Sequence, residues 1–420
     1  MSETEPMNID ERRKYIHKVW GRYREQGKKG KGRLLDEIEA VTGMHRKAII
    51  RILNGRLSRK KRTRERGKEY GVEVSYAVQL IARSLDYPCA ERLQPNLVWM
   101  AQHLQRHGEL KIGKEVLEKL ARISPSTLKR MLKPSERQRG KVARQQPRRP
   151  PTNHLRKQYP MRKIAWDILE AGHFEVDLVH HGGETALGEY IHTLQMVDIA
   201  TGWSEIVAVF GRSYRVMADG FDYLLARLPF AVQEIHPDNG AEFFNVNLLR
   251  YWKDKAPDLQ LSRSRPYQKN DNRFVEENNH SLIRAYIGHD RLDTQAQLKV
   301  LRQLHEKLWL YHNFFQPVMR LREKEYVSAL QYRRKYDQAK TPFDRLKEKD
   351  ILKENIQLQL ETLRSQTNPM SLRNEIDGLI SQLLSLPPLD HAETVNIFET
   401  LIKEADSSVT LSFEPTKPFG

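Results

Sequence analysis

Apolar side chains recur at helical spacing on both sides of a short turn in residues 33–55. They precede Thr42-Gly43 at Leu34, Leu35, Ile38 and Val41, and they follow it at Ile49, Ile50 and Leu53. Spacings of three and four residues place side chains on one face of a helix. Two such helices joined by a turn that contains Gly match the helix-turn-helix plan. The second helix would present four side chains to a DNA groove: His45, Arg46, Lys47 and Arg51.

A similar pattern returns in residues 113–134. Leu117, Leu120 and Ala121 come before a turn at Ile123-Ser124, and Pro125 follows Ser124. Ser at the N-cap followed by Pro in the first turn is typical of a helix start. The exposed face of this second helix would carry Ser126, Thr127, Lys129 and Arg130. Each of the two patterns fits either a DNA reader or a structural helical hairpin.

Residues 173–288 change from helical periodicity to short β-rich runs. The runs 173–179, 190–202 and 203–211 are separated by turns that contain Gly, which predicts three meandering strands. Helices are expected over 216–228, 241–256 and 274–288, with strands over 231–240 and 259–267. Meandering strands followed by alternating helices and strands favour a mixed α/β sheet.

The remaining sequence is expected to be helical. Residues 295–337 are rich in aromatic side chains, and amphipathic patterns fill 345–404. The tail helices would either assemble protomers or pack against the core. The resulting division is a helix-turn-helix domain (1–62), a second helical domain (63–133), a basic linker (134–163), an α/β core (164–315) and a C-terminal helical region (316–420).

Charge divides the chain in a second way. The net charge is +17 over 420 residues, but residues 1–163 hold +24 and residues 164–420 hold −7. A basic front of this kind suggests a nucleic-acid partner, because each phosphate that is neutralised releases counterions. The basic runs 56–68 and 133–163 either follow a phosphate backbone or are solvated linkers. Their candidate contacts are Lys60, Lys61, Arg62, Arg148 and Arg149.

Composition excludes several protein classes. Hydrophobic residues make up 39% of the chain, which is enough for folded cores. No stretch approaches the ~18 apolar residues of a membrane span, and the first residues contain no signal-peptide core. The single cysteine, Cys89, excludes a disulfide framework. We therefore expect a soluble cytoplasmic protein with no membrane partner.

Three acidic residues of the α/β region stand out by their settings. Asp177 lies within the first predicted strand, Asp238 at the end of the fourth, and Glu276 near the start of a helix. Carboxylates that converge at one edge of a sheet suit Mg²⁺, and two such ions support in-line phosphoryl displacement. Taken singly, Asp238 fits a turn, Asp177 fits a bulge or an ion pair, and Glu276 fits a solvated helix position with Glu277 as a rival.

The order of these acids and the motifs VDLV, HPDNGAEF and RPYQKNDNRFVEENN resemble the catalytic core of retroviral integrases and bacterial insertion-sequence transposases. These are the DDE enzymes, which have an RNase H-like fold. The resemblance covers 164–315. The run Val275-Glu276-Glu277-Asn278-Asn279 matches the family's Val-Glu-x-x-Asn, which favours Glu276 and makes Asn279 the matching amide. Asp198 looks like the family's second-strand Asp, which is usually structural.

The chain also departs from the family pattern. The loop before Glu276 lacks the usual glycine and is more basic, and the DNA-end candidates Gln268, Lys269 and Asn270 lie in it. The retroviral zinc-binding domain is replaced by the two helical hairpins.

The resemblance implies a function. The chain would bind the terminal inverted repeats of a mobile element, cleave at its ends and join the 3′-OH ends to target DNA. Two Mg²⁺ ions, or Mn²⁺ in their place, would be held by Asp177, Asp238 and Glu276. Such enzymes act on double-stranded DNA as dimers or tetramers, here in association with the bacterial nucleoid. The alternatives are an RNase H-like nuclease that cuts without joining and an inactive DNA-binding regulator on the same scaffold.

Overall fold

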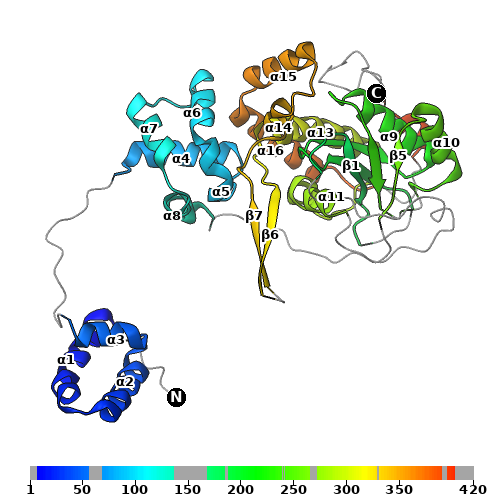
Figure 1. Cartoon of the computed structure of the whole chain (residues 1–420). Helices are drawn as coiled ribbons and strands as arrows, with labels where there is room; N and C mark the ends of the chain where they lie inside the picture. Colours follow the sequence, from blue (N-terminus) through cyan, green and yellow to red (C-terminus); the bar gives the residue numbers. More distant parts are fainter. Residues whose placement is uncertain are drawn as a thin grey trace. The chain divides into compact units, whose positions relative to one another are not determined.

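A computed structural model describes residues 7–55, 69–136, 168–184, 188–238, 240, 242–264, 272–328, 331–389 and 395–402. The chain divides into two compact units, residues 1–69 and residues 70–420 (Figure 1). Each unit has a hydrophobic cluster of its own.

The described part of the first unit consists of three helices, α1 (Ile9–Glu25), α2 (Lys28–Thr42) and α3 (Arg46–Leu53). Their apolar faces meet at Ile16, Ile38 and Ile49, each of which is fully buried. Gly43 ends α2 with φ of 63°, a left-handed conformation that glycine adopts at little cost. The helix, turn and helix predicted over 33–55 are therefore present.

Five helices begin the second unit. They are α4 (Val72–Ser84), α5 (Ala90–Leu93), α6 (Leu97–Arg106), α7 (Lys114–Arg122) and α8 (Pro125–Glu136). The sequence predicts a separate domain over 63–133. The structure instead places these helices in the same hydrophobic cluster as the sheet, and the boundary falls between Glu69 and Tyr70. Helical periodicity shows that a face is buried, but it does not show what covers that face.

The sheet has the mixed five-stranded form that the sequence predicts. Its strands are β1 (His173–His180), β2 (Ile191–Asp198), β3 (Ser204–Phe210), β4 (Glu234–Pro237) and β5 (Gln260–Leu261). They lie in the order β3-β2-β1-β4-β5. Antiparallel pairing joins β1, β2 and β3 as a meander, whereas β4 is parallel to both β1 and β5. This architecture is consistent with an RNase H-like core.

Helices cover both the faces and the edge of the sheet. They are α9 (Tyr214–Ala226), α10 (Val246–Lys255), α11 (Arg273–Asn278), a π-helical turn (Asn279–Arg284), α12 (Ala285–Ile287) and α13 (Gln295–Phe315). A Cβ added at Gly220 would lie 3.1 Å from Leu194, which shows how closely α9 approaches the sheet. Asn313 of α13 bonds to both the N–H and the C=O of Ser204, each at 2.9 Å, so α13 closes the free edge of β3.

The C-terminal region departs from its prediction. Helix is expected over 295–337, but residues 321–336 form a hairpin of β6 (Leu321–Ser328) and β7 (Gln331–Tyr336), so the prediction is wrong there. The segment is rich in Arg, Glu and Lys, which favour helices in isolation. The backbone of β6 instead pairs with that of β7, from Leu321 opposite Tyr336 to Ser328 opposite Gln331. Lys335 also lies 3.2 Å from Glu323 and 3.3 Å from Glu325, in exposed ion pairs that add little to this pairing.

Helices resume after the hairpin. They are α14 (Pro342–Glu348), α15 (Glu354–Gln366), α16 (Pro369–Ser385) and a 3₁₀ turn (Ile397–Thr400). None of the helices in the described ranges has the length and apolar character that crossing a membrane requires.

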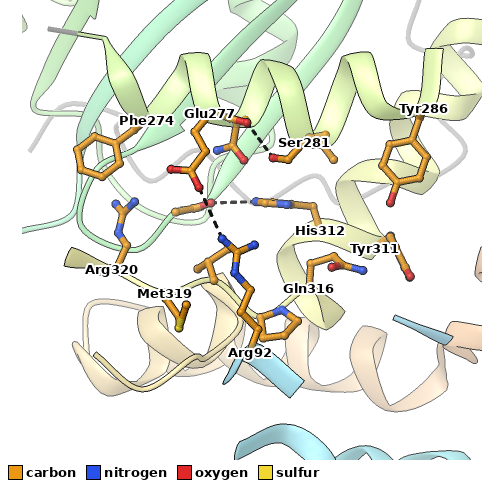
Figure 2. A pocket seen from close by; sticks show the side chains of 15 residues that line it. Arg92, Phe274, Glu277, Ser281, Tyr286, Tyr311, His312, Gln316, Met319 and Arg320 are labelled. Carbon is orange, nitrogen blue, oxygen red and sulfur yellow. Dashed lines mark hydrogen bonds and ion pairs between the residues drawn. The ribbon is translucent and has the colours of Figure 1, made fainter. Parts of the chain in front are cut away.

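A small cavity of about 90 Å³ lies where the chain enters the hairpin (Figure 2). Its walls come from α5, α11, the end of α13 and residues 316–320. The side chains that line it include Arg92, Phe274, Glu277, Tyr286, His312 and Arg320. One wall is thus the helix that carries the predicted third acid.

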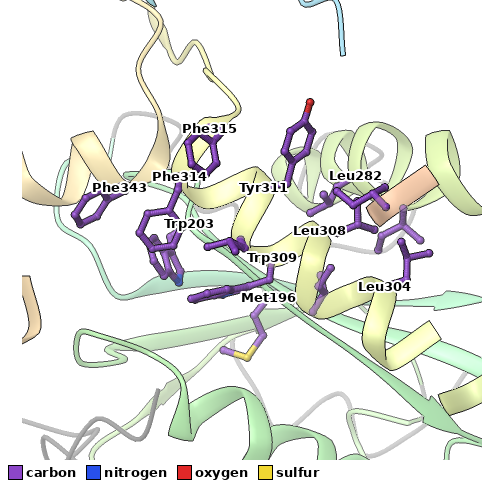
Figure 3. Packing of buried hydrophobic residues seen from close by; sticks show 14 of the residues in the cluster. Met196, Trp203, Leu282, Leu304, Leu308, Trp309, Tyr311, Phe314, Phe315 and Phe343 are labelled. Carbon is purple, nitrogen blue, oxygen red and sulfur yellow. The ribbon is translucent and has the colours of Figure 1, made fainter. Parts of the chain in front are cut away.

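Aromatic side chains fill the core between α13 and the sheet (Figure 3). Trp203, Trp309 and Phe314 meet edge to face, with ring centroids 5.7 to 5.8 Å apart. The indole N–H groups of both tryptophans donate to Glu205 Oε1, at 2.8 and 2.7 Å. A buried carboxylate therefore serves as the polar partner of the aromatic cluster.

Arg227 compensates the charge of this buried carboxylate. Its Nε lies 3.5 Å from Glu205 Oε2, and its Nη1 bonds to Glu306. Burial raises the pKa of Glu205 to about 7, and the Arg227 charge opposes that rise. Two buried acids therefore depend on one buried guanidinium.

We expect Arg227→Met to destabilise the second unit by about 3 to 5 kcal/mol, because it leaves two buried acids without a cation. Urea unfolding followed by tryptophan fluorescence measures this loss. Lys255→Met is the matched control, since the Lys255–Asp222 pair is largely exposed and its loss costs about 1 kcal/mol or less. Equal losses in the two variants would contradict the role given to Arg227.

Candidate active site

Two of the three predicted acids lie side by side at one edge of the sheet. Val176 of β1 pairs with Pro237 of the parallel strand β4. Asp177 and Asp238 are the next residues along these two chains. Because neighbouring strands lie about 4.8 Å apart, the two carboxylates leave adjacent strands at the same level.

Asp177 is held from two directions. Its Oδ1 accepts the N–H of Leu178 at 2.8 Å, and its Oδ2 accepts the Nδ2 group of Asn279. Burial raises the pKa of Asp177, and the nearby Glu242 charge raises it further, while these hydrogen bonds and Arg284 lower it. The carboxylate therefore lies in a site where a second negative charge is already close.

Asp238 forms the turn that its sequence context also suggested. Its Oδ1 accepts the N–H of Gly240 at 2.7 Å, which is the short-range bond of an Asx turn. This turn places Asp238 directly beyond the end of β4. Asp238 is therefore both a turn residue and an acid at the edge of the sheet.

Glu175 connects the strand of Asp177 to α11, the helix that carries Glu276. It lies two residues before Asp177 on β1, hence on the same face of the sheet. Its Oε2 accepts the N–H of Phe274 at 2.7 Å and the N–H of Val275 at 2.9 Å. These groups belong to the first turn of α11, where backbone donors have no partner within the helix. A buried carboxylate thus fixes the start of α11 against β1.

The structure separates Glu276 from its rival Glu277. Asn279, which bonds to Asp177, follows Glu276 by three residues, so the two side chains share one side of the helix. Glu277 instead lies 3.6 Å from Arg92 and faces the cavity of Figure 2. Helical spacing therefore favours Glu276 as the acid on the side of Asp177, and its part in a metal site stays a prediction.

The side chains around Asp177 offer oxygen donors to a divalent cation. In the described ranges, no three His, Cys, Asp or Glu side chains are arranged to hold one ion. Asp177 and Asp238 nevertheless supply adjacent carboxylates, and the buried Oδ1 of Asn279 has no hydrogen-bond partner. Carboxylate and amide oxygens are the ligands of Mg²⁺, so the chemistry of this group of residues fits the ion.

Of the four residues of the first unit that are predicted to face DNA, two have side chains that contact other residues of the unit. His45 caps α3, since its side chain accepts the N–H of Lys47 at 3.2 Å. Arg46 turns back to α2, where it pairs with Asp36 and donates to Gly32 at 3.2 Å, and its presentation to a groove stays a prediction. Lys47 and Arg51 are exposed.

The second helical hairpin begins as predicted. Ser124 caps α8, with its hydroxyl accepting the N–H of Thr127 at 3.2 Å. Arg130 donates to the Thr127 hydroxyl, also at 3.2 Å, while Ser126 and Lys129 are exposed. Contact of either hairpin with DNA stays a prediction. The other candidates lie outside the described residues: Lys60, Lys61, Arg62, Arg148, Arg149, Gln268, Lys269 and Asn270.

Sequence reasoning missed two acids of this site. Glu175 could have been predicted from the sequence, because residues two apart on a strand, such as Glu175 and Asp177, lie on the same face of the sheet. Glu242 belongs to the HPDNGAEF motif, and its carboxylate affects the pKa of Asp177. Asp198 is structural as expected, since Gly172 and Thr201 donate three hydrogen bonds to its carboxylate.

Comparisons with known proteins give two findings. The uncharacterized protein y4rM of Sinorhizobium fredii is 33% identical over 319 residues, which cover 76% of this chain and 90% of y4rM. The crystal structure of the catalytic core domain of BIV integrase matches with 15% identity and a TM-score of 0.29, covering 43% of this chain and 97% of that domain. No protein-family model matches the sequence.

We expect Glu175 to make stability depend on pH. Burial raises its pKa to about 7, whereas an unfolded Glu titrates near 4.3. As pH rises between these values, the unfolded carboxyl ionises first, so the native state loses stability. Relative to Glu175→Gln, the wild type should lose roughly 3 kcal/mol between pH 4.5 and 7.5.

Urea midpoints measured across this range test the effect. Glu354→Gln, at an exposed position in α15, should follow the wild type. A Glu175→Gln curve parallel to the wild type would contradict the assignment.

Proposed function

This chain belongs to the same family as the uncharacterized protein y4rM of Sinorhizobium fredii, and we propose that it is a Mg²⁺-dependent enzyme that cleaves DNA strands and joins them. The observation that carries the proposal is the register of β1 and β4, which sets Asp177 beside Asp238. Glu175 and Asn279 then tie the helix of Glu276 to the same strand.

Asp177 and Asp238 would hold the metal ions, and Glu276 would complete the set from α11. When bound, two Mg²⁺ ions stabilise the attacking and the leaving oxygen of an in-line phosphoryl displacement. Mn²⁺ would serve in their place, because it accepts the same oxygen ligands.

The surrounding residues would prepare the site for this task. Asn279 keeps Asp177 in one orientation, and Glu175 keeps α11 at a fixed distance from β1. The raised pKa of Asp177 reflects a carboxylate that is costly to ionise beside Glu242. A cation among these oxygens would offset that cost and favour the ionised form.

The substrate would be double-stranded DNA that includes the ends of a mobile element. The +24 charge of residues 1–163 supports a polyanionic partner, and two helical hairpins lie within that region. Joining two ends in one reaction would require a dimer or a tetramer. The enzyme would then be a DDE transposase that transfers the 3′-OH ends of the element to target DNA.

A nuclease that cuts without joining and an inactive regulator remain the competing functions. An oligonucleotide with a pre-cleaved element end separates them, because only a transposase would join that end to a second duplex. Inverted repeats found in the DNA on either side of the gene would supply the sequence of that oligonucleotide.

We expect Asp238→Asn to abolish Mg²⁺-dependent strand transfer, with a fall of at least about 10³-fold, because it removes one of two adjacent charged ligands. Binding of element ends, measured by fluorescence anisotropy, should stay unchanged. Strand transfer that persists in this variant, or in the wild type with excess EDTA, would overturn the proposed function.

The two neighbouring acids of α11 provide a matched comparison. Glu276→Gln should lose strand transfer as Asp238→Asn does, because Glu276 shares a side of the helix with Asn279. Glu277→Gln should keep most of the activity, since it loses only the contact with Arg92. The same loss in both variants, with folding intact by circular dichroism, would refute the choice of Glu276.

A further inference from the structure

The β6–β7 hairpin forms a sheet of its own that is separate from the five-stranded sheet. In Figure 1 it extends away from the helices that surround the main sheet. An isolated two-stranded hairpin is marginally stable in water, so its base must be anchored. We call residues 321–328 and 331–336 the basic ribbon.

The anchor begins at Asp337, directly after β7. Its carboxylate accepts the N–H of Arg320 at 2.7 Å and pairs with Arg345 of α14 at 2.6 Å. Arg345 also donates to the C=O of Val318 at 2.9 Å. The two ends of the ribbon are therefore clamped to α14.

A second contact joins the ribbon to the candidate active site. The guanidinium of Arg320 lies 4.4 Å from the ring centroid of Phe274, and the two side chains are adjacent in Figure 2. Phe274 is the residue whose N–H bonds to Glu175. Burial lowers the pKa of Arg273 at the start of α11, the Glu175 charge opposes this shift, and the Arg334 charge of β7 adds to it.

The charge of the basic ribbon is opposite to that of its half of the chain. Residues 164–420 hold −7, whereas residues 321–336 contain five Lys or Arg and two Glu. Lys335 contacts both of these acids, Glu323 and Glu325. The exposed arginines are Arg322, Arg333 and Arg334.

We propose that the basic ribbon binds double-stranded DNA next to the acidic site, with Arg322, Arg333 and Arg334 contacting phosphates. This inference rests on the proposed function and specifies where the substrate lies. A two-stranded ribbon fits the major groove, and arginines on it can reach the flanking phosphates. Asp337 and Arg320 hold the base of the ribbon to α14 and α11, so DNA bound along the ribbon would lie beside the candidate active site.

A second copy of the chain is the competing occupant, because a hairpin edge can pair with another strand. The exposed side chains argue against it, since the core of a protein interface is depleted in charged residues. Five cations in sixteen residues match a phosphate backbone instead.

The test uses the full chain with three substitutions, Arg322→Gln, Arg333→Gln and Arg334→Gln. Affinity for a 40-base-pair duplex is measured by anisotropy at several salt concentrations. If three phosphate contacts are lost, the slope of log K against log salt falls by about 2.7, and Kd at 0.15 M salt rises by about 10- to 100-fold.

The matched control removes the same charge at exposed lysines elsewhere in the second unit, namely Lys253→Gln, Lys299→Gln and Lys353→Gln. Its slope and affinity should stay within about twofold of the wild type. A ribbon variant that behaves like this control overturns the inference. So does a ribbon variant that changes sedimentation in the absence of DNA and leaves Kd unchanged, because that result identifies a second copy as the occupant.

A positional test follows from the single cysteine, Cys89. With Cys89→Ser, a cysteine placed by Arg333→Cys carries an azidophenacyl group and should photo-crosslink to the duplex. The same group placed by Leu358→Cys, at a position in α15 that is 64% exposed, should not. Equal yields at the two positions, or none at residue 333, would overturn the inference.

The two proposals fail separately. Ribbon-dependent DNA binding in a protein that never cleaves or joins DNA would refute the proposed function and leave the ribbon assignment standing. Strand transfer that needs Asp238 but is indifferent to the ribbon arginines would refute the ribbon assignment alone.

Discussion

The buried bond between Glu175 and the start of α11 is the interaction on which the site depends. One carboxylate oxygen accepts two backbone N–H groups that the helix itself cannot satisfy. The same strand carries Asp177 two residues later, and the same helix carries Glu276. The positive end of the helix dipole favours a negative charge here, while burial opposes it and raises the pKa of Glu175 to about 7. A single contact thus sets the distance between two acids that lie about a hundred residues apart in sequence.

Buried polar groups have the same positional role elsewhere in the second unit. Apolar packing stabilises any arrangement that excludes water. A buried hydrogen bond forms only in the arrangement that brings its donor and acceptor together. Asn313 fixes α13 to the edge of β3, and Arg227 fixes the end of α9 against Glu205. Asp337 clamps both ends of the hairpin in the same way. The aromatic core of Figure 3 supplies burial, and these groups determine where each helix lies.

Local patterns in the sequence were enough to predict the sheet and the placement of two acids. The β-rich runs separated by turns that contain Gly predict the meander of β1 to β3. Asp238 follows a short strand, so its position at a strand end can be predicted from the sequence. The hairpin at 321–336 was missed because Arg, Glu and Lys are compatible with a helix. Its strands are defined instead by their pairing with each other and by the Asp337–Arg345 pair, which lies outside the segment. The ion pair between Arg46 and Asp36 likewise cannot be predicted from the periodicity of apolar residues.

The distribution of charge now has a physical rationale at two scales. Across the chain, residues 1–163 hold +24 and residues 164–420, which include the sheet, hold −7, so a polyanion would be attracted to the first part and repelled from the carboxylates of the second. An acidic site that acts on phosphodiesters needs local cations to overcome this repulsion. Arg320 and the basic ribbon stand next to α11, within the part of the chain that holds net negative charge. Attraction over a short distance survives salt screening better than attraction across ~10 Å or more. Cations at this position would therefore act on the reacting strand itself, in addition to those of residues 1–163.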